Sequence, residues 1–455
     1  MKTRMNFKDE FYQKLKLLVL PIAIQNFMLA LVSATDAIML GWIDQTSLSA
    51  VSLAGQVQFV LSLFISGIAA GAGIMAAQYW GKQDAASIEK VIPIALRTNL
   101  LFSGLFTILA GFCPEMLMRI FTNDAALVAS GSQYLRAVAL SYVLCGISQV
   151  YLILLKNTGN AAVSSRISST AVVLNIILNA ILIYGLCGAP ALGIRGAAYA
   201  TVAARVVELI WAYLETKKPE RVRILWNRLF SSAGKILSED FWRYTLPVLA
   251  ASLVWGIAYV LYSVIMGHMG SDAVAANSIT SIAKSLLSCL IRGVSGGAGV
   301  LIGNLLGANE LEKAREYGGR LSHLSIAIGI VTGGLLMLIS PAIVHFAPLS
   351  DTAAEYLQYM LLFCGLNLMA QSVNTTVLDG IFCAGGDAKF DMQGNIGAMW
   401  CFSVPLGFLA AFWLKLPVMV VYCIVNLDEI VKLPAVYHHY KKYIWVRNIT
   451  RDVED

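Results

Sequence analysis

Apolar runs of about 20 residues follow one another along nearly the whole length of this 455-residue chain. An α-helix needs about 20 such residues to cross a hydrocarbon core of roughly 30 Å. Transmembrane β-barrels instead show alternating segments of about 10 residues, a pattern absent here. Charged residues make up 13% of the sequence, about half of the ~25% typical of soluble domains. The sequence therefore predicts an all-α polytopic membrane protein without a large soluble domain.

Polar breaks divide the apolar runs into twelve predicted transmembrane helices. The largest break lies at the midpoint of the chain and is rich in Lys and Arg. We expect an N-terminal six-helix bundle at 1–215, a cytoplasmic linker at 216–240, a C-terminal six-helix bundle at 241–440 and a cytoplasmic tail at 441–455. The spans are placed at 13–40, 50–77, 89–112, 132–155, 166–187, 192–215, 241–267, 275–305, 318–342, 353–378, 390–412 and 416–438.

The two halves of the chain repeat each other at an offset of 226 residues. Because an even number of spans separates equivalent points, the halves have the same orientation in the membrane. Parallel repeats of this kind form transporters in which the substrate path lies between halves that rock in alternating access. Glycines shared by the second and eighth spans predict close helix packing there. The aligned pairs are Pro21 with Pro247, residues 65–84 with 291–310, and, at an offset of 227, residues 157–161 with 384–388.

Lys and Arg residues concentrate in alternate loops. The loops at 81–90, 216–240 and 308–320 and the C-terminal tail are basic, whereas the opposite loops hold few such residues. Cytoplasmic loops carry the excess of positive charge, so we expect a multi-pass protein of the cell membrane with both termini in the cytoplasm. The first apolar stretch runs to about Leu40, too long for a cleaved signal peptide.

Cysteine and histidine residues form no pattern typical of a metal site or a disulfide framework. The eight cysteines lie singly without a CxxC pair, and the five histidines do not cluster with them. The net charge of +6 is distributed over short loops, which argues against a nucleic-acid partner. We therefore expect no cofactor other than a coupling ion, and a monomer in the lipid bilayer.

Asp36 is the most informative charged residue, because an ionisable group within a span costs a few kcal/mol and is a functional candidate by default. Its position in the other repeat is occupied by Tyr262, so the carboxylate is not a shared requirement of the fold. Asn175 and Asn179 lie four residues apart on one face of the fifth span, and Thr201 lies in the sixth. These oxygen-bearing side chains suit either Na⁺ or a proton-binding carboxylate. A purely structural carboxylate is the alternative.

Other polar residues within the spans give weaker indications. Arg205 and Glu208 are predicted to pair with each other, and Arg292 with Asp379. Lys284, aligned with Gln58 of the first half, lines a cavity or extends its ammonium group toward water.

Aromatic residues recur about one turn apart in the seventh span, at Trp255, Tyr259 and Tyr262. They could stack on a cationic substrate. Packing against lipid or protein is the alternative.

The order of several short motifs resembles the multidrug and toxic compound extrusion family. The motifs are Pro21, Asp36 and Gly41 in the first span, followed by AVSLA, LNIILNAILIYG, GIRGAAYATV and GNLLGAN. The resemblance covers the chain from Lys16 to its end. It implies two six-helix bundles and an antiporter, not an enzyme, that exports organic, often cationic and amphipathic compounds in exchange for H⁺ or Na⁺.

The resemblance also assigns roles to individual residues. It implies that Asp36 binds the coupling ion, that Asn175 and Thr201 are its partners, and that Pro21 bends the first span. Asn179 departs from several relatives, which have a second Asp there. One sodium-coupled branch uses a Glu and an Asp in the second half, at positions occupied here by Trp255 and by Gln371 or Ser372.

Two other functions compete with drug export as interpretations of the sequence. A flippase for lipid-linked precursors, or a metabolite exporter, is compatible with the same two-bundle plan, although a flippase is expected to carry more charge in its cavity. An intramembrane serine enzyme is suggested only by the GxSxG pattern around Ser295. Its repeat counterpart has Ala69 in place of the serine, and no histidine partner is evident.

Overall fold

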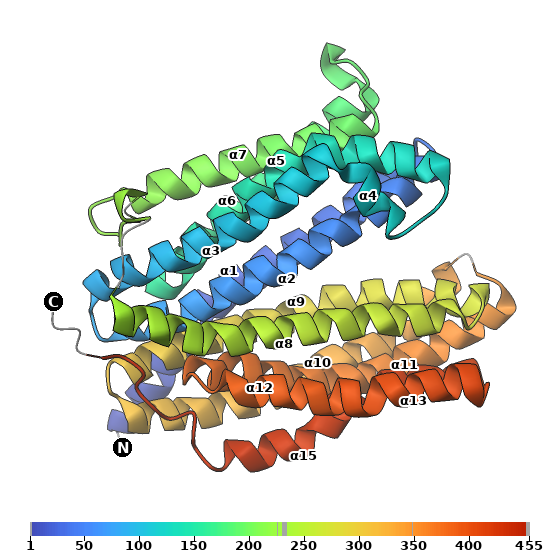
Figure 1. Cartoon of the computed structure of the whole chain (residues 1–455). Coiled ribbons are helices and arrows are strands. Elements are labelled where there is room, and N and C mark those ends of the chain that lie inside the picture. The colour runs from blue at the N-terminus through green and yellow to red at the C-terminus, as the bar shows by residue number, and fades with distance from the viewer. Residues whose placement is uncertain (1, 225, 230–233, 348, 452–455) are drawn as a thin grey trace. The chain divides into compact units, whose positions relative to one another are not determined.

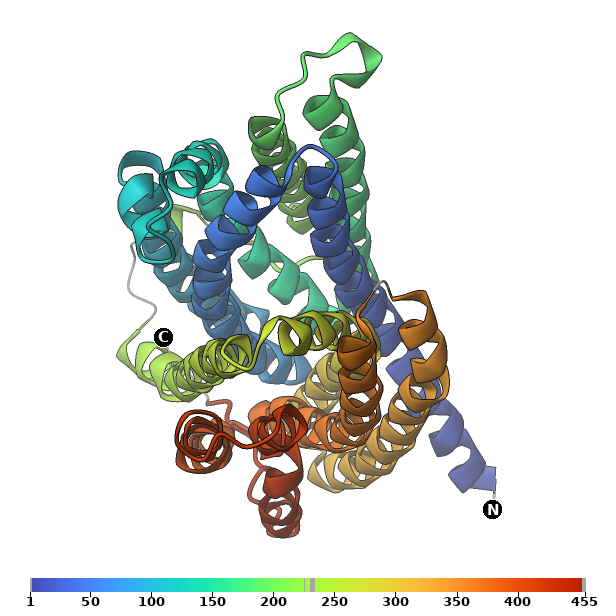
Figure 2. The ribbon, with the colours of Figure 1, turned by 90° about the vertical axis from the view of Figure 1, so that its right-hand side faces the viewer.

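The computed structural model describes residues 2–224, 226–229, 234–347 and 349–451. In these residues the chain is helical and contains no strand (Figures 1 and 2). Parts of the predicted linker at 216–240 and of the predicted tail at 441–455 lie outside them. The prediction of an all-α fold is confirmed.

The helices of the first half lie close to the predicted spans. They are α1 (Lys2–Gly41), α2 (Gln45–Gly81), α3 (Ala85–Phe112), α4 (Pro114–Arg119), α5 (Ala125–Leu155), η1 (Lys156–Asn160), α6 (Ala161–Tyr184), η2 (Leu186–Gly188), α7 (Ile194–Thr216) and η3 (Trp226–Arg228). The short η1 segment is π-helical, and η2 and η3 are 3₁₀ turns.

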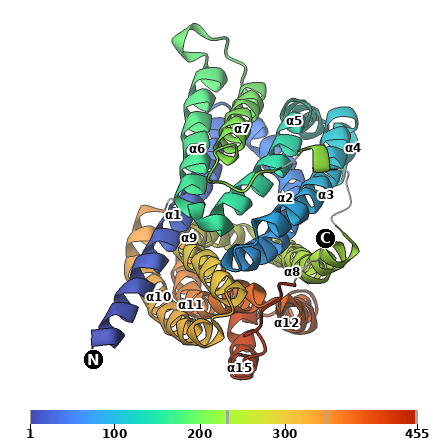
Figure 3. The same ribbon diagram turned by 90° about the vertical axis from the view of Figure 1, so that its left-hand side faces the viewer.

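The second half has a more broken end than the first. It contains α8 (Lys235–Gly267), α9 (Ser271–Gly307), α10 (Leu311–Phe346), α11 (Asp351–Thr375), η4 (Thr376–Phe382), α12 (Ala388–Asn395), η5 (Ile396–Ser403), α13 (Val404–Phe408), η6 (Leu409–Trp413), α14 (Val418–Val425) and α15 (Asp428–Tyr440). The segments η4, η5 and η6 are π-helical. Helices α9, α10 and α11 lie side by side (Figure 3).

Ten stretches of the described chain are long and apolar enough to cross a membrane. One of them, Ala125–Tyr184, contains both α5 and α6. The chain reverses between these two helices, since the Ser164 hydroxyl donates to the carbonyl of Leu152, twelve residues earlier. In a continuous helix these residues would be roughly 18 Å apart. The last predicted span is interrupted after Val425 and resumes at Asp428, so neither part is long enough to be counted alone.

The internal repeat is visible in the backbone. Gln83 and Asn309, 226 positions apart, are both left-handed, with φ of 63° and 61°, and each is the second residue after the end of its helix, α2 or α9. Gly159 and Gly386, 227 positions apart, have φ of 79° and 72°. Left-handed backbone is rare in non-glycine residues, so the recurrence at both offsets supports the aligned repeat.

Two compact units can be distinguished within the chain. Over the described residues, the N-terminal unit is Ile24–Leu249, and the C-terminal unit consists of the chain up to Ala23 together with 250–451. The boundaries therefore fall inside the continuous helices α1 and α8. The predicted domain limits at 215, 240 and 440 stay a prediction.

The glycines shared by the repeats allow close helix contacts within each unit. In the N-terminal unit, a Cβ at Gly71 of α2 would lie 2.7 Å from the Cα of Thr245 at the start of α8. In the C-terminal unit, a Cβ at Gly293 of α9 would lie 2.9 Å from the Cα of Ala23 in α1. Only glycine permits these approaches without a shift of the backbone, as the sequence predicted for small residues in packed membrane helices.

Candidate ion and substrate site

Asp36 lies in the last part of α1 and is half-buried. The amide nitrogen of Asn179, on α6, donates to its Oδ1 at 2.5 Å. Asn179 itself is fully buried. The structure thus brings the carboxylate of the first span next to the polar face of the fifth.

A chain of hydrogen bonds extends from this carboxylate across α6 to α7. Asn179 Nδ2 also contacts Asn175 Oδ1 at 3.3 Å, and Asn175 Nδ2 donates to Thr201 Oγ1 at 3.3 Å. Thr201 in turn donates to the carbonyl of Ala197 at 3.0 Å. The four residues singled out from the sequence therefore form one connected cluster.

The charge of Asp36 is not balanced by a nearby cation. No ion pair to Asp36 occurs among the residues described in the structure, and its one side-chain partner there is the neutral amide of Asn179. The carbonyl oxygen Oδ1 of Asn179 has no hydrogen-bond partner in the same part of the chain. A half-buried carboxylate with one neutral donor is a group that readily takes up a cation.

A cavity of about 350 Å³ opens beside Asp36, within the N-terminal unit. This volume lies within the range of small-molecule sites, roughly 300–1,000 Å³. Its walls combine apolar and aromatic side chains with a few polar groups, which is typical of such sites. The lining includes Leu29, Val32, Asp36, Gln58, Phe59, Tyr134, Val172, Asn175, Thr201, Arg205 and Glu208.

Arg205 and Glu208 form the second charged group of this cavity. Arg205 Nη1 lies 2.7 Å from Glu208 Oε2, so the predicted ion pair is present. Glu208 also accepts hydrogen bonds from Ser148 at 3.0 Å and Ser168 at 3.2 Å. With three donors, Glu208 is satisfied as an ionised carboxylate, in contrast to Asp36.

The aromatic residues and Lys284 belong to the C-terminal unit. Trp255 and Tyr259 stack on each other with ring centroids 5.5 Å apart, and Tyr262 is buried in the hydrophobic core. Lys284 donates to Asn367 Oδ1 at 2.8 Å. These four residues therefore do not line the cavity beside Asp36, whereas Gln58 does.

Two further sequence features, Pro21 and the GxSxG pattern, lie inside helices. Pro21 lies within the continuous helix α1. Ser295, the centre of the GxSxG pattern, lies in the middle of α9 and donates its hydroxyl to the carbonyl of Thr375 at 2.8 Å. The pattern therefore lacks the strand-turn-helix context of a nucleophilic serine.

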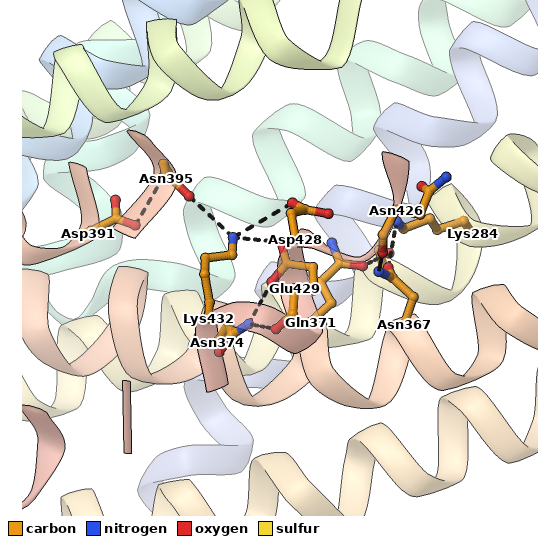
Figure 4. A network of polar contacts seen from close by, with 11 residues as sticks. Lys284, Asn367, Gln371, Asn374, Asp391, Asn395, Asn426, Asp428, Glu429 and Lys432 are labelled. Atoms are coloured by element: carbon orange, nitrogen blue, oxygen red, sulfur yellow. Dashed lines mark hydrogen bonds and ion pairs between the residues drawn. The ribbon is translucent and has the colours of Figure 1, made fainter. Parts of the chain in front are cut away.

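Sequence reasoning missed a buried polar network in the C-terminal unit (Figure 4). Its centre is Lys432 of α15, whose ammonium lies 3.0 Å from Glu429, 3.2 Å from Asn395 and 3.9 Å from Asp428. The sequence contains a signal for this network, because Asp428, Glu429 and Lys432 fall inside the last predicted span at i, i+1 and i+4. The predicted pair of Arg292 and Asp379 is absent from the ion pairs formed by the described residues.

Comparisons with known proteins agree on one family. The MatE family profile matches residues 21–181 and 247–409, one match in each half. The chain is 21% identical to the probable multidrug resistance protein YoeA of Bacillus subtilis, over 99% of this chain and 98% of that one. It is 24% identical to the probable multidrug resistance protein NorM of Agrobacterium fabrum, over 84% and 83% of the two chains.

Solved structures with the same fold cover almost the whole chain. A MOP superfamily transporter from Pyrococcus furiosus gives a TM-score of 0.85 at 20% identity, with 95% of each chain covered. A variant of the Vibrio cholerae MATE transporter VcmN gives a TM-score of 0.87 at 15% identity, with 96% of this chain and 99% of the other covered. With a profile match in each of its two halves, this chain belongs to the MatE family, the multidrug and toxic compound extrusion transporters.

Proposed function

We propose that this transporter exports organic, cationic and amphipathic compounds in exchange for protons, with Asp36 as the coupling carboxylate. The observation that carries the proposal is the position of Asp36. It lies on the wall of a cavity of about 350 Å³, with a single neutral hydrogen-bond donor and without an ion pair in the part of the chain that the structure describes.

The cavity supports a cationic and partly apolar substrate. Leu29, Val32 and Val172 provide apolar surface, and Phe59 and Tyr134 provide aromatic surface, on which a cation can also be held. Because Arg205 is neutralised by Glu208, the unbalanced charge on the cavity wall is that of Asp36. A cationic substrate and a coupling proton would therefore compete for the same negative charge.

The orientation of Asn179 favours a proton over Na⁺ as the coupling ion. Asn179 presents its amide nitrogen, not its carbonyl oxygen, to Asp36. Sodium would require several oxygen ligands directed at one point, whereas the hydrogen bonds described here run from nitrogen to oxygen along the chain of side chains. In the proposed cycle, proton uptake by Asp36 removes the charge that holds the substrate, the substrate leaves, and inward release of the proton restores the site.

The test uses everted membrane vesicles, energised by respiration, with a pH-sensitive dye. Ethidium is added with and without Na⁺ to vesicles containing wild type, Asp36→Asn or Asp124→Asn. Asp124→Asn is the matched control, since Asp124 is an exposed helix cap and Asn also caps helices. Wild type and the control should dissipate the proton gradient without Na⁺, and Asp36→Asn should not.

Three other results would each change the proposal. Dissipation that survives in Asp36→Asn would refute the role of this residue. A response that requires Na⁺ would replace the proton by sodium. A lack of response to ethidium and other organic cations would favour the flippase or metabolite exporter.

We also propose cytoplasmic termini and a monomeric state, which cysteine labelling from each side and light scattering in detergent would test.

A further inference from the structure

The last membrane span is interrupted inside the C-terminal unit. Helix α14 ends at Val425 and α15 begins at Asp428, and both pack against α11. The backbone carbonyl of Asn426, between the two helices, accepts a hydrogen bond from the side-chain amide of Asn367 of α11 at 2.6 Å. Non-helical backbone at membrane depth is tolerated where it is buried in protein or lines a cavity, because unpaired peptide groups are otherwise too costly in a bilayer. Transporters typically build their binding sites at such interrupted helices.

Charged side chains gather at this interruption (Figure 4). Asp428 and Glu429 form the first turn of α15, and Lys432 lies one turn later. Asp391 of α12 joins the group through Asn395, whose amide nitrogen lies 3.2 Å from Asp391 Oδ1 and whose carbonyl lies 3.2 Å from the Lys432 ammonium. The exposed fractions of Asp391, Asp428 and Lys432 are 6%, 5% and 5%.

The carboxylates of this network outnumber its cations by one. Four carboxylates interact electrostatically here, from Asp379, Asp391, Asp428 and Glu429, and three cationic side chains do so, from Lys284, Arg292 and Lys432. The hydroxyl of Tyr262, on α8, also faces Asp428 and Glu429. An unbalanced buried carboxylate costs several kcal/mol and is relieved when the group takes up a proton.

Of the four carboxylates, Asp379 is exposed. The hydrogen bonds indicate which of the other three is least stabilised when ionised. Glu429 accepts from Lys432 at 3.0 Å and from Asn374 at 2.7 Å. Asp428 has the ion pair with Lys432 and the positive end of α15. Asp391 accepts from one neutral amide, and none of the ion pairs in the described residues includes it.

We propose that Asp391 is a second proton-binding site, located in the C-terminal unit and linked through Asn395 to the buried ammonium of Lys432. The site uses α12 and the α14–α15 interruption, and it is separate from Asp36. When Asp391 holds a proton, Lys432 balances the acids of α15. When Asp391 loses it, the new negative charge draws Lys432 toward α12, so that protonation changes how α12 and α15 are held together.

One buried oxygen atom near this site is placed to bind a water molecule that could enter with the proton. The carbonyl oxygen of Asn374, a residue that is 2% exposed, lacks a hydrogen-bond donor among the described residues. Its amide nitrogen is fixed to Glu429. A water molecule that donates to this oxygen would satisfy it.

The test measures protonated carboxyl groups directly, by infrared spectroscopy of the purified full-length protein during a pH titration. Surface carboxyls lose their protons near pH 4, so a C=O stretch that persists above about pH 6 reports buried carboxyls. Wild type should show two such titrating signals. Asp36→Asn should keep one, Asp391→Asn should keep the other, and the double variant should lose both. Asp351→Asn, an exposed residue of α11, is the control and should match wild type.

Two outcomes would overturn the proposal: loss of every titrating signal in Asp36→Asn, or an unchanged spectrum in Asp391→Asn. If Asp391→Asn does not fold, Lys432→Met replaces it, because removal of the ammonium should make Asp391 hold its proton to higher pH. An unshifted titration in Lys432→Met would equally refute the link. These signals do not depend on transport, so they remain interpretable if ethidium is not a substrate.

Discussion

The contact between Gly71 and Thr245 gives a sharp test of how α2 is held in the N-terminal unit. A Cβ added at Gly71 would lie 2.3 Å from Thr245 Oγ1, 2.6 Å from its Cβ and 2.7 Å from its Cα. Separations under 3.0 Å do not occur for real Cβ atoms, and the Cα belongs to the backbone of α8. Thr245 is fully buried. No side-chain rotation can relieve this overlap, so Gly71→Ala must push α2 and α8 apart.

Overpacking of this kind costs about 1–3 kcal/mol. The better helix propensity of Ala offsets up to about 1 kcal/mol of that cost. Gly104 of α3 provides the control, because a Cβ there meets nothing within 4 Å. Gly104→Ala should therefore gain roughly 0.5–1 kcal/mol through propensity alone.

Thermal unfolding in detergent, followed by size-exclusion chromatography with fluorescence detection, measures both variants. Gly71→Ala should unfold at a lower temperature than wild type, and Gly104→Ala at an equal or higher one. Thr245→Gly combined with Gly71→Ala should recover part of the loss, since it removes two of the three close atoms. A Gly71→Ala variant as stable as wild type would show that the close approach of α2 and α8 is wrong.

Two more predictions concern the ion pair of the cavity and a helix cap. Glu208→Gln removes the counter-charge of Arg205, whose side chain is 20% exposed on the cavity wall, and should destabilise the protein by up to about 3–5 kcal/mol. The double variant Arg205→Met with Glu208→Leu should be close to neutral in an unfolding assay. Equal losses in both would argue against a partly buried pair. Asp44 caps α2 through the Ser47 hydroxyl and amide, both at 2.6 Å, and these bonds hold the pKa of the Asp44 carboxyl below its usual range. The cap should contribute about 1 kcal/mol to the free energy of unfolding. This contribution is fully present above the pKa of Asp in the unfolded chain, ~3.9, and is lost as pH falls through the lower pKa of the folded state. Asp44→Ala should therefore lower stability at pH 7 but have little effect near pH 2.

The sequence predicted the helices well because the bilayer imposes a length and a composition on each of them. The spans near α1, α2 and α9 and the offset that relates Pro21 to Pro247 follow directly from apolar runs and repeated glycines. The adjacency of Asn175 and Asn179 follows from helical periodicity, and the pairing of Arg205 with Glu208 follows from their spacing of three residues. Such local relations are encoded within a few residues of each other.

Relations between distant segments could not be predicted in the same way. The contact of Asp36 with Asn179 joins residues 143 positions apart, and the sequence supplied only their chemical compatibility. The network around Lys432 brings together residues of α11, α12 and α15, whose mutual rotation is set by packing. The interruption between Val425 and Asp428 was missed because an apolar run with three charges near its end resembles a span that simply meets the membrane surface.

The start of α1 belongs to a unit whose other part begins only at Ala250. Phe11 contacts Tyr317 with ring centroids 4.8 Å apart, Leu15 lies in a core with residues of α9 and α10, and Gly293 packs on Ala23. About 300 residues must leave the ribosome before these partners exist, and contacts so distant in sequence form slowly. During biogenesis, the start of α1 must therefore be held in the membrane with its packing face covered by lipid or by an insertion factor until α9 arrives.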